Sequence, residues 1–140
     1  MKFTVSTKIL LEPRQALEKF DAPLFTALAP PFPKVRLVRF SESAVEIALD
    51  FLVYKTVWAS KVFPAQFEEN QAFFVDEGVR LPPPLKFWRH THRLVARPGG
   101  ALLRDEIEFS TGYRPLDLLV FPFLWAMMAY RKPIYRKRLR

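Results

Sequence analysis

The two histidines of the chain stand two residues apart, at His90 and His92. Side chains spaced by two point to the same face of a β-strand, so both rings would act on one surface. Asp105 lies on the next strand-like segment, and Pro98-Gly99-Gly100 between the two segments is a strong hairpin signal. A turn at Pro98-Gly99 sets His92 opposite Asp105, whereas a turn at Gly99-Gly100 makes the two residues diagonal neighbours. Both registers predict a carboxylate within reach of an imidazole.

A carboxylate beside an imidazole favours the protonated ring, so this group could move a proton or hydrogen-bond the polar end of a ligand. The alternative is a buried polar pair that satisfies itself and fixes the register of the strands. A His-x-His pair on a strand can also chelate zinc, with Asp105 as a third ligand. Because the chain has two histidines and no cysteine, we expect neither a metal ion nor a cofactor.

The elements that must position these residues follow from periodicity. Apolar and polar residues alternate over 2–9, which predicts a strand, and strands are also predicted within 34–63 and over 71–77, 86–97 and 101–109. Proline and aspartate signals predict two short helices over 14–20 and 24–28. Helical spacing from Pro115 to Ile134 predicts a long terminal helix, kinked near Pro122.

These elements predict an α+β fold over residues 1–140, which we expect to form one soluble domain. A curved antiparallel sheet of about six to seven strands would wrap around the C-terminal helix. That helix is apolar nearly all round between Leu116 and Tyr130, so it must be buried on more than one side. Its apolar run is shorter than the roughly 20 residues of a membrane span.

The positive charge gathers at the C-terminus. Six of the formal +8 charges lie in the last ten residues, at Arg131, Lys132, Arg136, Lys137, Arg138 and Arg140, and the rest of the chain is nearly neutral. We interpret this run as a solvated helix end and expect no nucleic acid partner. Peripheral membrane contact through this helix is the main alternative. The first residues carry no apolar run like that of a secretory signal, so we expect a cytoplasmic protein.

The element order resembles the helix-grip fold of the START and polyketide-cyclase superfamily. Three segments carry a closer likeness: Phe74-Val75-Asp76-Glu77, Trp88-Arg89-His90-Thr91-His92 and Asp105-Glu106-Ile107-Glu108-Phe109. They are similar to a run in uncharacterised bacterial ligand-binding members, with an Asp, a Gly-Pro-Phe loop, Trp-x-His-x-His, a hairpin and Asp-x-(Ile or Val)-x-Tyr. Here Leu81-Pro82-Pro83-Pro84 replaces the glycine-bearing loop, and Phe109 stands where tyrosine is usual.

The resemblance implies a cavity between the sheet and the long helix that receives a lipid, a polyketide or an aromatic metabolite. We expect the ligand to contact Phe74, Trp88, His90, His92, Leu94, Asp105, Ile107, Phe109, Phe123, Trp125, Met127 and Met128. The chain shows no phosphate-binding loop, nucleophile elbow or acidic cluster suited to magnesium, which argues against hydrolase or nucleotide chemistry. A binding module is the first hypothesis, because an apolar lining with a few polar groups is typical of a small-molecule pocket. Two alternatives stay open: a cyclase or dehydratase that uses His90, His92 and Asp105 as acid and base, and a docking protein that uses the basic helix. A homodimer is also left open.

Overall fold

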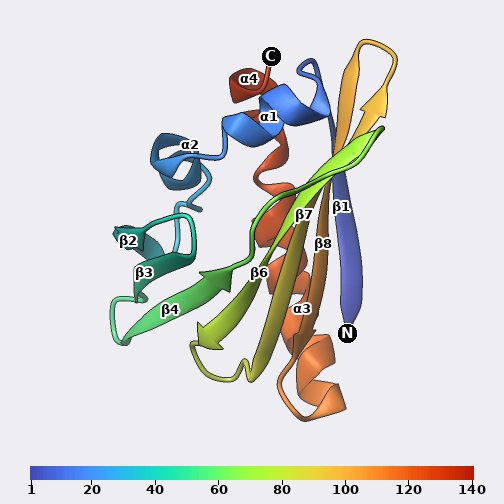
Figure 1. Ribbon diagram of the computed structural model, residues 1–140. Helices are drawn as coiled ribbons and strands as arrows, with labels where there is room; N and C mark the ends of the chain where they lie inside the picture. The colour runs from blue at the N-terminus through green and yellow to red at the C-terminus, as the bar shows by residue number, and fades with distance from the viewer.

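The computed structural model describes residues 1–140 and contains one antiparallel sheet and four helices (Figure 1). The elements follow in the order β1 (Lys2–Ile9), α1 (Pro13–Glu18), α2 (Ala22–Ala27), β2 (Lys34–Phe40), β3 (Ala44–Asp50), β4 (Lys55–Val62), β5 (Gln66–Phe67), β6 (Gln71–Arg80), β7 (Phe87–Arg97), β8 (Gly100–Ser110), α3 (Arg114–Ala129) and α4 (Lys132–Arg138).

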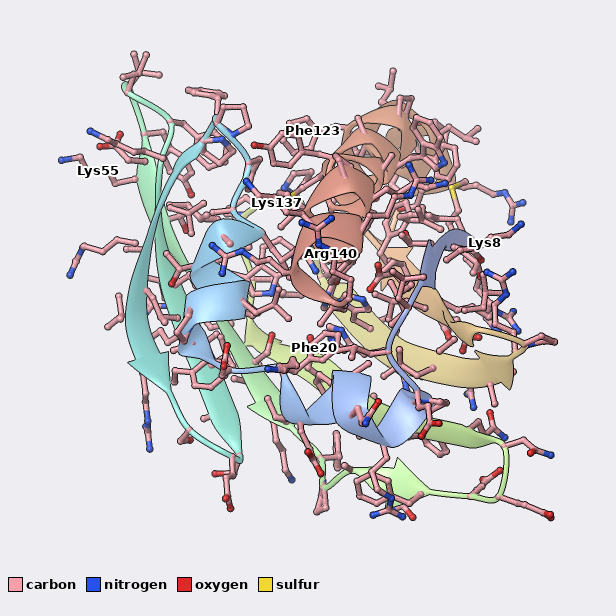
Figure 2. All side chains as sticks on the ribbon, turned by 90° about the horizontal axis from the view of Figure 1, so that it is seen from above. Lys8, Phe20, Lys55, Phe123, Lys137 and Arg140 are labelled. Carbon is pink, nitrogen blue, oxygen red and sulfur yellow. The ribbon has the colours of Figure 1, made fainter.

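The sheet has the strand order β1-β8-β7-β6-β4-β3-β2, with the two-residue β5 pairing with β6 at the side. Seen from above in Figure 2, the strands form a curved wall, and α3 lies inside the curve. Helices α3 and α4 contact β1, α1 contacts β6 and β7, and α2 contacts β2. The predicted α+β fold, a curved antiparallel sheet around a C-terminal helix, is therefore confirmed. No helix of the structure combines the length and the apolar character needed to cross a bilayer.

In the long central strands, buried side chains alternate with more exposed ones, and the buried side chains form the core. Every second residue of β8 from Ala101 to Phe109 is buried, because side chains of a strand point alternately to its two faces. Apart from Asp105, these residues belong to two apolar clusters. One gathers Leu94 and Leu103 with Tyr135 and residues of α1 and α2, and the other joins Trp88, Ile107 and Phe109 to α3. The residues between the two clusters, on the concave face of β7 and β8, are polar.

The hairpin between β7 and β8 adopts the first of the two registers left open by the sequence. Arg97 pairs with Gly100, so Pro98-Gly99 forms the turn and His92 lies opposite Asp105. Gly100 belongs to the strand, where its φ of +152° and its contact with the backbone of Ile9 leave no room for a side chain. The close approach of β1 thus helps to fix the register.

The prediction of one unbroken helix to Ile134 was wrong. The helix ends at Ala129 and a second helix begins at Lys132, whereas Pro122 remains inside α3. Pro133 has no backbone N–H to donate to the carbonyl of Ala129 four residues earlier, so the helical hydrogen-bond ladder is interrupted at Tyr130 and Arg131. The short strand β5 was also missed, because two residues carry no periodic signal.

Candidate functional site

A cavity of about 940 Å³ lies between the concave face of the sheet and the helices. Of the 37 residues that line it, 23 are hydrophobic. They come from α1, α2 and α3, from strands β2, β3, β4, β6 and β7, and from the loop at Pro82-Pro83-Pro84. Small-molecule sites in proteins have volumes of roughly 300–1,000 Å³ and are predominantly apolar, so this cavity matches them in size and character.

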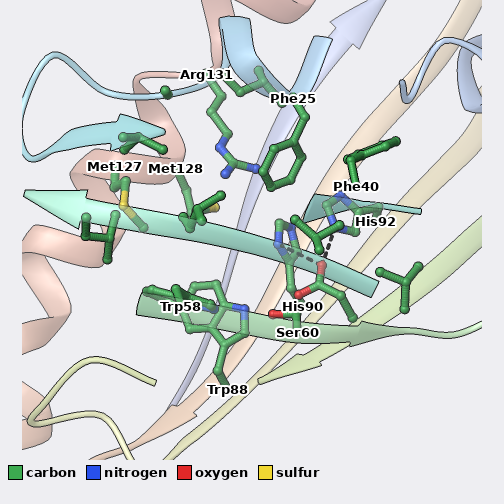
Figure 3. Close-up of a pocket in the computed structure, with 18 of the residues that line it drawn as sticks. Phe25, Phe40, Trp58, Ser60, Trp88, His90, His92, Met127, Met128 and Arg131 are labelled. Atoms are coloured by element: carbon green, nitrogen blue, oxygen red, sulfur yellow. Dashed lines mark hydrogen bonds and ion pairs between the residues drawn. The ribbon is translucent and has the colours of Figure 1, made fainter. Parts of the chain in front are cut away.

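Aromatic rings and thioethers form much of the apolar lining (Figure 3). Trp58 from β4 and Trp88 from β7 meet edge to face, with ring centroids 4.8 Å apart. Met127 and Met128 of α3 also line the cavity. Methionine adapts its shape, and aromatic rings offer flat faces, so this lining suits a flat apolar molecule.

A polar cluster of four side chains lies at one wall of the cavity. His90 Nε2 is 2.8 Å from Asp105 Oδ1, and His92 Nε2 is 2.7 Å from Asp76 Oδ2. Two longer approaches close the cluster: His90 Nδ1 lies 3.7 Å from Asp76 Oδ2, and His92 Nδ1 lies 3.8 Å from Asp105 Oδ1. We call Asp76, His90, His92 and Asp105 the His–Asp cluster.

Stacking holds the two imidazole rings in place. Their centroids are 3.7 Å apart, and Phe74 stacks on the other side of His92 at 4.2 Å and an interplanar angle of 7°. The edge of Phe20 closes the site at 5.7 Å from His92. The rings are therefore already oriented by packing before any ligand arrives, which lowers the entropy lost on binding.

Burial, hydrogen bonds and nearby charges together set the charge states of Asp76, His92 and Asp105. Burial lowers the pKa of His92 to about 4, helped by the neighbouring His90 and opposed by Asp76 and Asp105. Burial acts to raise the pKa values of Asp76 and Asp105, but their histidine hydrogen bonds and the nearby positive groups lower both overall. At neutral pH the two carboxylates are thus ionised and His92 is neutral.

The neutral His92 ring has one hydrogen and one lone pair on its two nitrogens. Because Nε2 faces the ionised Asp76 carboxylate, we assign the hydrogen to Nε2, which donates to Asp76. The remaining nitrogen, Nδ1, is buried and has no hydrogen-bond partner. His92 therefore holds a free proton acceptor in the lining of the cavity.

Arg131 corrects our interpretation of the basic C-terminus. Its side chain lines the cavity, and Figure 3 shows it pointing inward from the junction of α3 and α4. The Nε and Nη1 atoms are buried and have no hydrogen-bond partner. Burial acts to lower the pKa of Arg131, but the neighbouring Tyr135, Asp105 and Asp76 raise it overall. The other arginines of the run, Arg136, Arg138 and Arg140, are exposed as expected.

Comparison with known proteins rests on structure, because no protein-family model and no curated protein matches the sequence. The di-domain ARO/CYC StfQ from the steffimycin biosynthetic pathway has a TM-score of 0.69 at 10% identity over 99% of this chain, which spans 50% of StfQ. Ara h 8.0201 has a TM-score of 0.59 at 12% identity over 96% of both chains. Zhui aromatase/cyclase from Streptomyces sp. R1128 has a TM-score of 0.57 at 13% identity over 100% of this chain and 94% of that chain.

These likenesses cover the whole curved sheet and its C-terminal helix. The chain has the same helix-grip fold as these three proteins. At identities of 10–13% the comparisons establish the fold, and the chemistry of this helix-grip protein must be argued from its own residues.

The cavity of this helix-grip structure includes seven of the twelve residues expected to contact a ligand. They are Phe74, Trp88, His90, His92, Phe123, Met127 and Met128. Leu94, Ile107 and Phe109 are buried in the apolar clusters instead, and Asp105 reaches the site through His90. Trp125 is absent from the lining and is 49% exposed, because it follows the buried Leu124 on α3 and faces away from the cavity.

Two polar residues of the site were missed. Asp76 stands two residues after Phe74, and that spacing could have placed both on one face of a strand. Arg131 gave no such signal, because it reads as the first charge of a solvated basic run. Its burial depends on the break between α3 and α4.

Asp76, His90 and His92 are the residues that could hold a metal ion. Each offers one ligand atom, and these atoms lie within 4.8 Å of one another. Asp76 and His92 already bond each other, and the cation of Arg131 acts on the same carboxylate. We therefore propose no metal here, and the expectation that none is needed stays a prediction.

Proposed function

We propose that the protein binds a small hydrophobic molecule, of the lipid, polyketide or aromatic metabolite class, between the sheet and α3. The observation that carries this proposal is the cavity of about 940 Å³ with its mainly hydrophobic lining and the His–Asp cluster at one wall. An apolar ligand would leave water for this lining, which is favourable in proportion to the apolar area removed from water. The polar end would face His90 and His92.

The shape of the lining supports a flat or ring-bearing ligand. Trp58 and Trp88 present perpendicular ring systems, and Met127 and Met128 can adapt to an irregular edge. Two of the structurally similar proteins are named as aromatase/cyclases, which is compatible with an aromatic or polyketide ligand here.

The first test is native mass spectrometry of the purified protein, followed by solvent extraction and identification of anything released. We expect a defined apolar molecule in stoichiometric amount, or binding of added fatty acids and aromatic ketones by a protein purified empty. An empty protein that ignores the whole panel would contradict the proposal.

Two substitutions to phenylalanine on one strand provide a test and its matched control. Ser60 of β4 is buried and lines the cavity, whereas its neighbour Lys61 is exposed on the opposite face. Ser60→Phe should narrow the cavity and weaken binding of the extracted ligand, and Lys61→Phe should leave binding unchanged. Equal binding by both variants would place the ligand elsewhere.

A second candidate function is acid–base catalysis, and the unpartnered Nδ1 of His92 is the observation that favours it. This nitrogen could take a proton from a carbon next to a carbonyl, leaving the electron pair of the broken C–H bond on the ligand as an enolate. Returning a proton from water would complete an exchange, and attack of the enolate on a second carbonyl would close a ring.

Deuterium incorporation tests this candidate without knowledge of the natural substrate. Incubation with 2-tetralone in D₂O should accelerate exchange of its acidic C–H groups, followed by NMR. His92→Gln keeps an N–H donor for Asp76 but removes the basic ring nitrogen, so it should abolish the acceleration while the circular dichroism spectrum stays unchanged. Equal exchange rates with and without His92 would reject catalysis by this ring.

Three further expectations stay predictions. Membrane contact through the exposed Arg136, Lys137, Arg138 and Arg140 would appear as binding to anionic vesicles that weakens steeply with salt. A homodimer would appear in analytical ultracentrifugation, and a cytoplasmic location in cell fractionation.

A further inference from the structure

The guanidinium of Arg131 is a charged donor group for which the protein provides no acceptor. Its Nε and Nη1 atoms are shielded from solvent and make no hydrogen bond. The hydroxyl of Tyr135 is buried and close enough to affect the pKa of Arg131, but the contact lacks the geometry of a hydrogen bond, and the hydroxyl is itself without a partner. Buried donors are almost always paired in native proteins, and an unpaired one is strongly unfavourable.

The charge of Arg131 is compensated although its hydrogen bonds are not. Asp76 and Asp105 both act on the guanidinium and raise its pKa overall. Their short hydrogen bonds go to the histidines, to His92 from Asp76 and to His90 from Asp105. Arg131 therefore has compensating negative charge nearby, but no acceptor atom for its hydrogen bonds.

We propose that Arg131 hydrogen-bonds an uncharged oxygen of the ligand, a carbonyl or a phenol, and so selects oxygenated aromatic or polyketide-like molecules over plain hydrocarbons and carboxylic acids. This inference rests on the proposed binding function of the cavity. The Arg131 side chain extends from the α3–α4 junction and lines the same cavity as Trp58 and Trp88 (Figure 3). An oxygen there would fill the missing acceptor position while the rings of the ligand pack on the apolar walls.

The nearby charges argue against a carboxylate as the acceptor. Two ionised carboxylates already face one guanidinium, and His92 is neutral at pH 7. A third anion would add an uncompensated negative charge to a buried site, which is strongly unfavourable. An uncharged oxygen supplies the acceptor without that penalty.

Three probes that share one ring system separate these possibilities: fluorene, 9-fluorenone and fluorene-9-carboxylate. Binding to the full chain would be followed by quenching of tryptophan fluorescence and by calorimetry at pH 7. For Arg131→Met we expect an affinity for 9-fluorenone that is lower by about tenfold or more, as for loss of a hydrogen bond to a charged group. The affinity for fluorene should stay unchanged or rise, and wild type should bind the carboxylate more weakly than the ketone.

The exposed Arg136 of α4 provides the control, because Arg136→Met removes the same charge outside the cavity. It should bind all three probes like wild type, and thermal melting would verify that both variants are folded. If Arg131→Met lowers the affinities for fluorene and 9-fluorenone equally, or if the carboxylate binds best, the inference is overturned while the cavity proposal stands. If wild type binds neither fluorene nor the ketone, the binding proposal fails and this inference with it.

Discussion

His90 bonds Asp105 although His92 is the residue directly opposite Asp105 across the β7–β8 pair. The same crossing occurs on the other side, where Asp76 lies opposite His90 but bonds His92. Each histidine therefore reaches a carboxylate that is diagonal to it, and the two diagonals connect β6, β7 and β8. In this crossed arrangement the stacked rings satisfy both acids at once, which makes the cluster sensitive to loss of any one member.

Replacing Asp105 should destabilise the fold. Asp105 is 1% exposed, and Asp105→Asn keeps an acceptor oxygen for His90 but removes the buried charge that balances Arg131. We expect the free energy of unfolding to fall by about 1–3 kcal/mol in urea titrations. Glu108→Gln, on the exposed face of the same strand, should change it by less than about 0.5 kcal/mol. Similar small effects in both variants would contradict a structural role for the crossed pairs.

The free energy of unfolding should decrease in two stages as the pH is lowered. Because the folded-state pKa of His92 is about 4 and its unfolded value is 6.5, the unfolded chain binds more protons between these values. The contribution of a neutral His92 is therefore fully present above pH 6.5 and is lost as the pH falls toward 4, by up to about 3 kcal/mol.

The second stage belongs to the carboxylates. The pKa values of Asp76 and Asp105 are lowered below 3.8 in the folded state, so their contribution is present above that pH and is lost as the pH falls further. Urea unfolding at a series of pH values measures both stages. His92→Gln should flatten the first stage and leave the second, and an unchanged slope between pH 4 and 6.5 would contradict the assignment to His92.

Zinc should not stabilise the protein. Asp76 already accepts a hydrogen bond from His92, and a cation would also meet the positive charge of Arg131. We expect thermal melting temperatures within about 1 °C of each other with equimolar Zn²⁺ and with EDTA, since a ligand stabilises only the state that binds it. A clear rise with Zn²⁺ that disappears in His90→Gln would establish a metal site instead.

Replacing large side chains by alanine should affect stability differently on the two faces of α3. Met128 is 1% exposed and lines the cavity, so Met128→Ala should lower the free energy of unfolding by about 2–5 kcal/mol. Trp125 is half exposed, and Trp125→Ala should have a much smaller effect and leave 9-fluorenone binding unchanged. Loss of 9-fluorenone binding in Trp125→Ala would show that Trp125 belongs to the binding site.

Alternating polarity in the sequence was enough to predict the long strands and the face that His90, His92 and Asp105 share. The register of β7 and β8 needed the structure, because the choice depends on the contact between Gly100 and Ile9, which are far apart in the sequence. The partner of His92 could not be predicted either. Asp76 lies on β6, and the loop that joins β6 to β7 is rich in proline. Unlike a two-residue turn, such a loop does not fix the register of the two strands.

The position of Arg131 was hidden for a different reason. A run of basic residues normally indicates a solvent-exposed segment, and nothing in its composition distinguishes the first arginine from the others. Pro133 was the one local signal, since it predicts a break close to Arg131. Where the side chain goes after that break depends on how Tyr135 and Leu139 of the following segment pack into the core, and that is a tertiary property.

The break between α3 and α4 also separates two properties of the cavity. Helix α3 contributes apolar wall through Leu124 and Met128, whereas the guanidinium is carried by a junction whose direction is set by the anchoring of α4 on β1 and the core. Substitutions in the junction could change the polarity that the cavity offers without altering its walls. Ligand preference could therefore diverge among proteins of this architecture through a few residues of one turn, with the sheet left intact.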